Sequence, residues 1–387
     1  MKKLTLTLSA ALICLSMSAQ ESLWRNSEIV SPEISDEGVV TFRLFAPDAQ
    51  NVQLTGSCVA TAQPLVKDED GLWSWTSEGP LKSDLYIYNF VVDGVRTTDP
   101  NNAYTIRDVS YVFSYFIVEH GKADYYRAQN VPHGSLGKVW YESEFLGTQR
   151  RMTIYTPPGY EDGKDKYPVL YLLHGMGGDE DAWSTLGRVQ YIMDNMIAEG
   201  RATPMIVVMP NGNTDRHDAT PGEDGLGLFK PYPSGAFDTS FEGHFGDVIQ
   251  YVDSHYRTIR KKSGRAIAGL SMGGLHSNMV SVNYPQTFDY VGLFSPATPN
   301  DRVRQNPDFK AHQMYEQYDL KLSKLFRNGV KVYYLAIGRD DFLYESNRTF
   351  RRKLDDIGAR YVYVESDGGH TWTNWRDYLT DFVSRIF

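Results

Sequence analysis

Residues 267–274 read Ile-Ala-Gly-Leu-Ser-Met-Gly-Gly, and this stretch decides the fold expected for the larger part of the chain. Ser271 stands at its centre, between Gly269 and Gly273. In a Gly-x-Ser-x-Gly turn a strand passes into a helix so sharply that the serine backbone is strained, and a side chain at either flanking position would collide with the turn. The pattern therefore predicts a strand, a tight turn and a helix. About 0.1 to 0.2 such matches arise by chance in a chain of this length, so the surrounding sequence has to support the prediction.

The sequence on both sides of this stretch alternates between apolar strands and amphipathic helices. Expected strands cover residues 151–156, 168–173, 205–209, 265–270, 290–294, 330–337 and 361–364. Expected helices cover residues 189–197, 245–252, 309–326 and 346–357, and a last one begins at Trp372. Such alternation is typical of a parallel sheet with helices on both faces, so we expect an α/β domain over residues 141–387.

The first part of the chain has the period-two pattern of strands instead. Val40, Phe42 and Leu44 alternate with polar residues, and helix signals are nearly absent. Short strands separated by turn residues predict a small β-sandwich over residues 20–120. Gly, Pro and polar residues then break the pattern, so residues 121–140 are expected to form a linker.

Three segments of this sandwich resemble the immunoglobulin-like carbohydrate-binding modules of the family 48 type: residues 41–47, 71–75 and 88–94. Flat aromatic rings stack on sugar rings, but alternation also places about half of the aromatic side chains of a strand in the core. Four aromatic residues of the sandwich could serve either purpose: Trp73, Trp75, Tyr86 and Tyr88. Core packing is the simpler explanation for each of them, and glycan binding is the alternative.

Residues 1–19 have the features of a secretory signal peptide, because Lys2 and Lys3 precede an apolar run that ends in small residues. The run is too short for a stable membrane span, and no other stretch of the sequence could form one. Cys14 follows the bulky Ile13, whereas lipid attachment needs a small residue there. A periplasmic or secreted protein is therefore expected, and a lipoprotein is the less favoured alternative.

The composition of the mature chain excludes some partners. Removal of Lys2 and Lys3 lowers the formal charge from −9 to −11, which argues against nucleic acid as a partner. Cys58 would be the remaining cysteine, so no internal disulfide is expected. The sequence leaves the oligomeric state open.

A serine nucleophile needs a base beside its hydroxyl and an acid that orients the base. In folds with a Gly-x-Ser-x-Gly turn, called the nucleophile elbow, these residues follow one another along the chain in the order Ser, Asp or Glu, His. His276 lies on the helix of the elbow itself, and His312 lies in an expected polar helix. His370 follows the last strand in a glycine-rich loop that permits close approach. We therefore expect His370 to be the base.

The acid has two adjacent candidates. Asp340 and Asp341 both follow the strand expected at 330–337, and a turn presents only one of them inward. Asp341 is our choice, although spacing alone leaves Asp340 open. Asp367 and Glu345 are weaker candidates, because loop solvation and a helix start explain them.

The negative charge that develops on an attacked carbonyl needs two backbone donors. One is expected to be the amide of Met272, directly after the serine, and the other the amide of Met176, in the turn after the strand 168–173. His174 is expected to brace that turn. The histidines are scattered without zinc-ligand spacing, so neither a metal nor an organic cofactor is expected.

Five segments in the right chain order together resemble carbohydrate esterase family 1, which contains feruloyl and acetylxylan esterases and has esterase D and the mycolyltransferases as relatives. They are Leu-Leu-His-Gly-Met-Gly-Gly at 172–178, Val-Met-Pro-Asn-Gly at 208–212, Gly-Leu-Ser-Met-Gly-Gly at 269–274, Gly-Arg-Asp-Asp at 338–341 and Gly-Gly-His-Thr-Trp at 368–372. The resemblance implies an α/β-hydrolase fold and ester hydrolysis. It also implies that Asp341, at the fourth position of the Gly-x-x-Asp segment, is the acid.

The acyl group is inferred from aromatic residues. Trp183, Trp372 and Trp375 flank the expected oxyanion and histidine loops, and the long segment 211–241 is expected to form a lid or rim. Aromatic walls suit a feruloyl group, so we expect feruloyl esters of plant cell-wall polysaccharide such as arabinoxylan, or of its oligosaccharides. An acetylated glycan such as acetylxylan is the alternative.

Two other classes of protein fit the sequence less well. A glycan-binding protein without catalysis is disfavoured by the intact candidates for the serine, the acid and the base. A serine peptidase of the same sheet architecture usually carries a propeller domain, which the N-terminal stretch is too short to form.

Overall fold

The computed structural model describes residues 29–108, 111–213, 240–301 and 314–387. The predicted signal peptide, most of the predicted lid, His312 and the start of the helix expected at 309–326 lie outside these ranges. Two compact units are present: one comprises residues 1–82, 86–105 and 114–116, and the other comprises 83–85, 106–113 and 117–387. Within the described ranges, no helix combines the length and the apolar composition that a membrane span requires.

The first unit is a β-sandwich, as the alternating pattern predicted. One sheet has the order β1 (Glu33–Ile34), β2 (Val40–Phe45), β6 (Leu72–Thr76), β5 (Val66–Lys67). The other contains β4 (Gln63–Pro64), β3 (Val52–Gly56), β7 (Asp84–Val92) and β10 (Tyr111–Val118) as successive neighbours, with β8 (Val95–Thr97) paired to β7. Phe42 of β2 meets Tyr88 of β7 with 4.8 Å between ring centroids, and both side chains are fully buried. The core therefore lies between the two sheets.

The aromatic residues considered for glycan binding differ in exposure. Trp73 is buried and its indole nitrogen donates to the carbonyl of Ala46, and the buried Tyr88 hydroxyl donates to Asp99. These two side chains pack in the core. Trp75 and Tyr86 are partly exposed, and their contact with a glycan stays a prediction.

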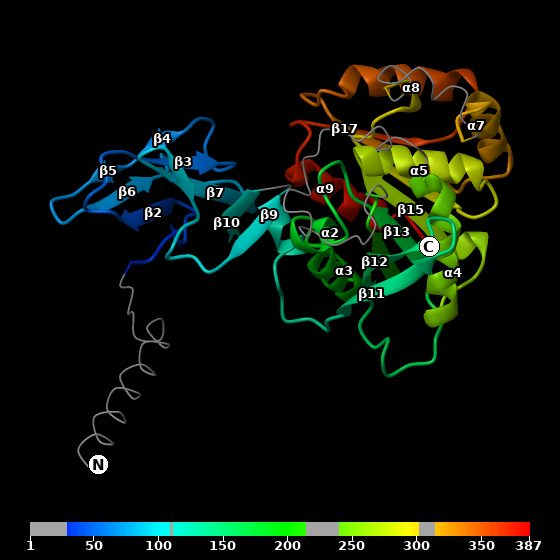
Figure 1. Cartoon of the computed structure of the whole chain (residues 1–387), viewed down its shortest axis with the longest axis horizontal. Coiled ribbons are helices and arrows are strands. Elements are labelled where there is room, and N and C mark those ends of the chain that lie inside the picture. Colours follow the sequence, from blue (N-terminus) through cyan, green and yellow to red (C-terminus); the bar gives the residue numbers. More distant parts are fainter. Residues whose placement is uncertain (1–28, 109–110, 214–239, 302–313) are drawn as a thin grey trace, which may run out of the picture. The chain divides into compact units, whose positions relative to one another are not determined.

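In the described part of the second unit, eight strands form one sheet, shown with its helices in Figure 1. Their order is β11 (Ser135–Ser143), β12 (Thr148–Thr156), β14 (Ile206–Pro210), β13 (Val169–Leu173), β15 (Arg265–Leu270), β16 (Tyr290–Phe294), β17 (Val332–Gly338), β18 (Val362–Ser366). The strands from β14 to β18 are parallel, as expected. β12 runs antiparallel to both of its neighbours. Its pairing with β11 is a hairpin, because the connection between them is too short for a crossover. β11 begins inside the segment predicted as a linker.

The remaining elements include the expected helices, but the helix expected at 309–326 begins only at Tyr318, and residues 314–317 form a turn. The remaining elements are β9 (Thr105–Asp108), η2 (Lys122–Tyr125), α2 (Ala182–Thr185), α3 (Val189–Ala198), α4 (Ser240–His255), η3 (Lys262–Gly264), α5 (Met272–Asn283), α7 (Tyr318–Arg327), α8 (Tyr344–Asp356) and α9 (Trp372–Val383). Helices α4, α5, α7 and α8 each bury apolar residues in one core with alternate residues of the central strands. The intervening strand residues meet α9 on the opposite face, where Phe382 packs against Phe294 and Tyr334.

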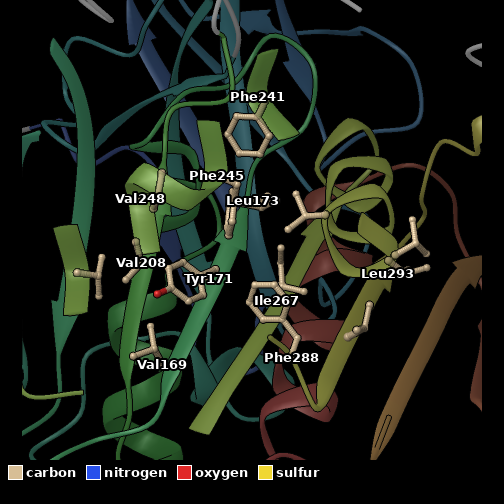
Figure 2. Close-up of a cluster of buried hydrophobic side chains, with 14 of the residues drawn as sticks. Val169, Tyr171, Leu173, Val208, Phe241, Phe245, Val248, Ile267, Phe288 and Leu293 are labelled. Carbon is tan, nitrogen blue, oxygen red and sulfur yellow. The ribbon is translucent and has the colours of Figure 1, made fainter. Parts of the chain in front are cut away.

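Figure 2 shows part of the first of these cores. Phe241, Phe245 and Val248 of α4 lie against Tyr171 and Leu173 of the central strand β13. These side chains are at most 2% exposed, so the middle strands are covered completely and read as continuous apolar runs in the sequence.

The sheet with helices on both faces is the α/β-hydrolase fold. Strands β13, β15, β17 and β18 are parallel members of it, and their carboxyl ends therefore meet at one edge. The loops after these strands carry His174, Ser271, Asp341 and His370. The fold thus brings together segments that are nearly 200 residues apart in the sequence.

Candidate active site

Ser271 occupies a strained turn between β15 and α5. Its backbone angles are φ 52° and ψ −114°, which a residue with a side chain rarely adopts. A Cβ atom on Gly273 would lie 2.5 Å from the carbonyl oxygens of Leu173 and His174, and one on Gly269 would lie 2.4 Å from the oxygen of Gly273. Neither position has room for a side chain. The two glycines of the motif are therefore required by the close approach of β15, α5 and the loop after β13.

The backbone of Ser271 is held on both sides. Its N–H donates to the carbonyl of Phe294 at 2.9 Å, and its carbonyl accepts from Leu275 and Ala297 at 3.1 and 3.0 Å. The side chain is partly exposed. A serine fixed in this way presents its hydroxyl without the conformational freedom of a surface loop.

His370 pairs with Asp341. The Nδ1 atom of His370 lies 3.0 and 2.9 Å from the two carboxylate oxygens of Asp341, whose side chain has no solvent exposure. The N–H of Leu343 also donates to this carboxylate, at 2.9 Å. An ionised carboxylate only accepts hydrogen bonds, so Nδ1 carries the proton and Nε2 is left as an acceptor.

The other carboxylates considered for the acid are exposed, and within the described residues no hydrogen bond joins them to His370. Asp340 is exposed, and its backbone N–H donates to the carbonyl of Gly368, which joins the loops after β17 and β18. Asp367 is 93% exposed and pairs with Arg339, while the exposed Glu345 pairs with Arg348. Asp341 is therefore the member of this group that the fold directs at the histidine.

The described residues contain no hydrogen bond between the Ser271 hydroxyl and His370. β16 and β17 separate the strand that ends at Ser271 from the strand that precedes His370. The two residues share the carboxyl edge of the sheet.

The loop after β13 lies directly beside the serine. A Cβ atom on Gly175 would be 3.3 Å from the Cβ atom of Ser271, so the backbone of Gly175 runs next to the serine side chain. The amide of Met272 is the first of α5 and has no acceptor within the helix. The two amides expected to receive an oxyanion thus belong to segments that meet at Ser271.

His174 braces this loop. Its Nδ1 atom is 2.7 Å from the carbonyl of Gly175, and its Nε2 atom accepts from the N–H of Gly212 at 2.8 Å. Burial lowers the pKa of His174 to about 4, so the ring is neutral at pH 7. A neutral ring whose two nitrogens are both occupied by backbone groups is suited to holding a loop and not to taking a proton from Ser271.

Further polar contacts join the loop after β13 to the loop after β14. The fully buried Glu180 pairs with Arg151 and accepts from the amide of Asn211 at 2.8 Å. Burial, with the neighbouring Asp179 charge, raises the pKa of Glu180. The amide of Asn213 donates to the carbonyl of Gly178 at 2.8 Å. The loops after β13 and β14 are therefore tied together beside the serine.

The three tryptophans expected near the site form one series of edge-to-face contacts. Trp372 lies 5.2 Å from both Trp183 and Trp375, and Trp375 lies 4.9 Å from the His370 ring. Trp183 is 1% exposed and donates to the carbonyl of Leu173, and Trp375 is 7% exposed. Trp372 is partly exposed, so it is the indole of the three that offers most surface.

One residue at the site was missed by the sequence reasoning. Phe342 follows Asp341 directly, is 77% exposed and lies 4.5 Å from the His370 ring between centroids. Its place beside the expected acid was a signal that could have identified it.

Comparison with known proteins agrees with this geometry. The family model described as putative esterase matches residues 143–386. An endo-1,4-beta-xylanase/feruloyl esterase of Xylanibacter ruminicola is 32% identical over 272 residues, which are 69% of this chain and 36% of that protein. The chain therefore spans about a third of the length of that relative.

Two further proteins extend the comparison. An acetyl esterase of Caldicellulosiruptor saccharolyticus is 26% identical over 55% of this chain and 80% of its own length. A solved structure of a ferulic acid esterase is 28% identical with a TM-score of 0.54, covering 67% of this chain and all of that one.

Proposed function

Because the chain belongs to the putative esterase family and is accordingly a carboxylic ester hydrolase, we propose that it removes feruloyl groups from plant cell-wall polysaccharide such as arabinoxylan. The named activities of the Xylanibacter ruminicola protein and of the ferulic acid esterase support this choice of acyl group. The partly exposed Trp372, with Trp183 and Trp375 packed behind it, supplies an aromatic wall for the feruloyl ring.

In the proposed reaction, Nε2 of His370 takes the proton of Ser271 as the hydroxyl oxygen attacks the ester carbonyl. The amides of Met272 and Met176 stabilise the negative charge on the carbonyl oxygen. His370 then donates the proton to the leaving alcohol, and water repeats the cycle on the acyl-enzyme. Asp341 keeps the imidazole in the tautomer and orientation that both transfers need.

The observation that carries this proposal is the pairing of His370 Nδ1 with the buried carboxylate of Asp341, at the sheet edge where Ser271 is strained. A histidine oriented by a buried acid is the base that serine activation requires. No other pair of described side chains in these loops combines an acceptor nitrogen with such support.

The Ser271→Ala variant tests the assignment of the nucleophile. Hydrolysis of methyl ferulate should fall by at least about a thousandfold in kcat, because the acyl-enzyme cannot form. Thermal unfolding should change little, since the removed hydroxyl is partly exposed. Turnover near that of the wild-type enzyme would refute the proposed role of Ser271.

Acetylated glycan is the second candidate substrate, and the similarity to an acetyl esterase favours it. Initial rates with methyl ferulate and acetylxylan, each compared with 4-nitrophenyl acetate as a general ester, separate the two. Release of acetate without release of ferulate would replace the first choice by the second.

Export is also part of the proposal. The basic and apolar residues 1–19 support a periplasmic or secreted protein. Amino-terminal sequencing of the protein from an expressing bacterial host should find a cleaved chain beginning near residue 20, and an intact Met1 in the periplasm or medium would contradict cleavage.

A further inference from the structure

Phe342 exposes a large aromatic ring at a position where the fold does not require one. Its neighbours Asp341 and Leu343 are 4% and 8% exposed, whereas Phe342 is 77% exposed. A side chain with so little burial adds little to the folded state, and any polar residue would be tolerated in its place. An exposed aromatic residue beside a reactive centre therefore calls for an explanation in terms of a ligand.

The contact of Phe342 with His370 fixes which part of a substrate it can meet. The two ring centroids are 4.5 Å apart with the planes inclined at 50°. The His370 ring also makes an edge-to-face contact with the buried Trp375, at 4.9 Å between centroids. The imidazole thus contacts one buried ring and one exposed ring.

The chemistry of the proposed function then separates the two halves of the ester. Ser271 Oγ bonds to the carbonyl carbon, the bond from that carbon to the alkoxy oxygen breaks, and the proton held by His370 passes to the alkoxy oxygen. The alkoxy oxygen must therefore come within hydrogen-bond distance of the imidazole. The group attached to it lies beside His370, while the acyl group remains on the serine.

From this geometry we propose that Phe342 forms the subsite for the alcohol half of the ester, and that the alcohol it receives is a sugar. The inference rests on the proposed function of the site. The C–H face of a sugar ring packs on an aromatic face, as aromatic residues in carbohydrate sites do, whereas a methyl group covers little of that face. Phe342 therefore favours glycosyl esters over simple alkyl esters of the same acid.

The test compares two substrates that share the acyl group and differ in the alcohol. They are a feruloylated arabino-oligosaccharide and methyl ferulate, or an acetylated xylo-oligosaccharide and methyl acetate if the enzyme accepts acetyl groups. The ratio of kcat/KM for the sugar ester to that for the methyl ester should fall about 5- to 10-fold in Phe342→Ala. The Phe342→Tyr variant keeps the ring and should retain the wild-type ratio.

Leu320→Ala is the matched control, because Leu320 is also a large apolar residue with 62% exposure but lies on α7. Its ratio should equal that of the wild-type enzyme. An equal loss on both substrates in Phe342→Ala would mean that the ring acts on His370 and would overturn the inference, as would no loss on either. Absence of any ester hydrolysis by the wild-type enzyme would instead refute the proposed function, and this inference with it.

Discussion

His174 should make the stability of the protein fall as the solution is acidified. His174 is 3% exposed, and burial lowers its pKa to about 4 from its ordinary value of 6.5. Between these two values the unfolded chain binds a proton at His174 and the folded chain does not. Protonation therefore favours unfolding. The contribution of the neutral ring to the free energy of unfolding is complete above pH 6.5 and is lost progressively as the pH falls toward 4.

The size of the effect follows from the difference between the two pKa values. The difference between 6.5 and about 4 corresponds to about 3 kcal/mol over the whole window. Between pH 7 and pH 5, the binding equilibria give a loss of about 2 kcal/mol in the free energy of unfolding. This is a large part of the stability of an ordinary domain.

Urea unfolding of the wild-type protein and of His174→Gln at pH 7 and pH 5 measures this contribution. The wild-type protein should lose about 2 kcal/mol more than the variant over this range, because other titrating groups are common to both. Equal losses in the wild-type protein and His174→Gln would show that the buried ring is not kept neutral, and the reasoning would fail.

Two further predictions concern the elbow and the acid. Gly273→Ala should lower the melting temperature by several degrees, because its Cβ atom would lie 2.5 Å from two carbonyl oxygens. The control Gly246→Ala, on α4, should leave the melting temperature unchanged, because its Cβ atom would meet no atom within 4 Å. Similar melting curves for the two variants would contradict the steric argument. Asp341→Asn should reduce kcat for ester hydrolysis by about a hundredfold to ten-thousandfold, because an amide can hold the wrong tautomer of His370. Asp340→Asn should keep kcat within about threefold of the wild-type value. A larger loss of kcat in Asp340→Asn than in Asp341→Asn would assign the acid to Asp340.

Local sequence patterns were sufficient to predict most of the strands and helices of the second unit. The strand expected at 290–294 is β16 with the same bounds, and the strand expected at 265–270 is β15, because buried parallel strands are continuous apolar runs. Ser271 and His370 could be selected as the candidate nucleophile and base for the same reason. Each lies in a glycine-rich turn directly after such a run, and the fold order of parallel strands brings these turns to one edge.

The edge of the sheet was harder to predict. β11 starts at Ser135, between Gly134 and Gly137, where the sequence reads as a linker. Its residues up to Trp140 are mostly exposed, so the strand lacks an apolar pattern and is held by its pairing with β12. Such pairing depends on a partner strand and leaves no local signal.

What the sequence alone determined, therefore, is the alternation of elements and the residues that stand at their ends, because both depend on neighbours within a few positions. The choice of Asp341 over Asp340 at His370 depends on the direction of one turn and on a contact across 29 residues. The burial of Trp183 and Trp375 and the exposure of Phe342 depend on which side chains of other elements cover them. Only the tertiary structure decided these points, since the contacts concerned join segments that the chain itself keeps apart.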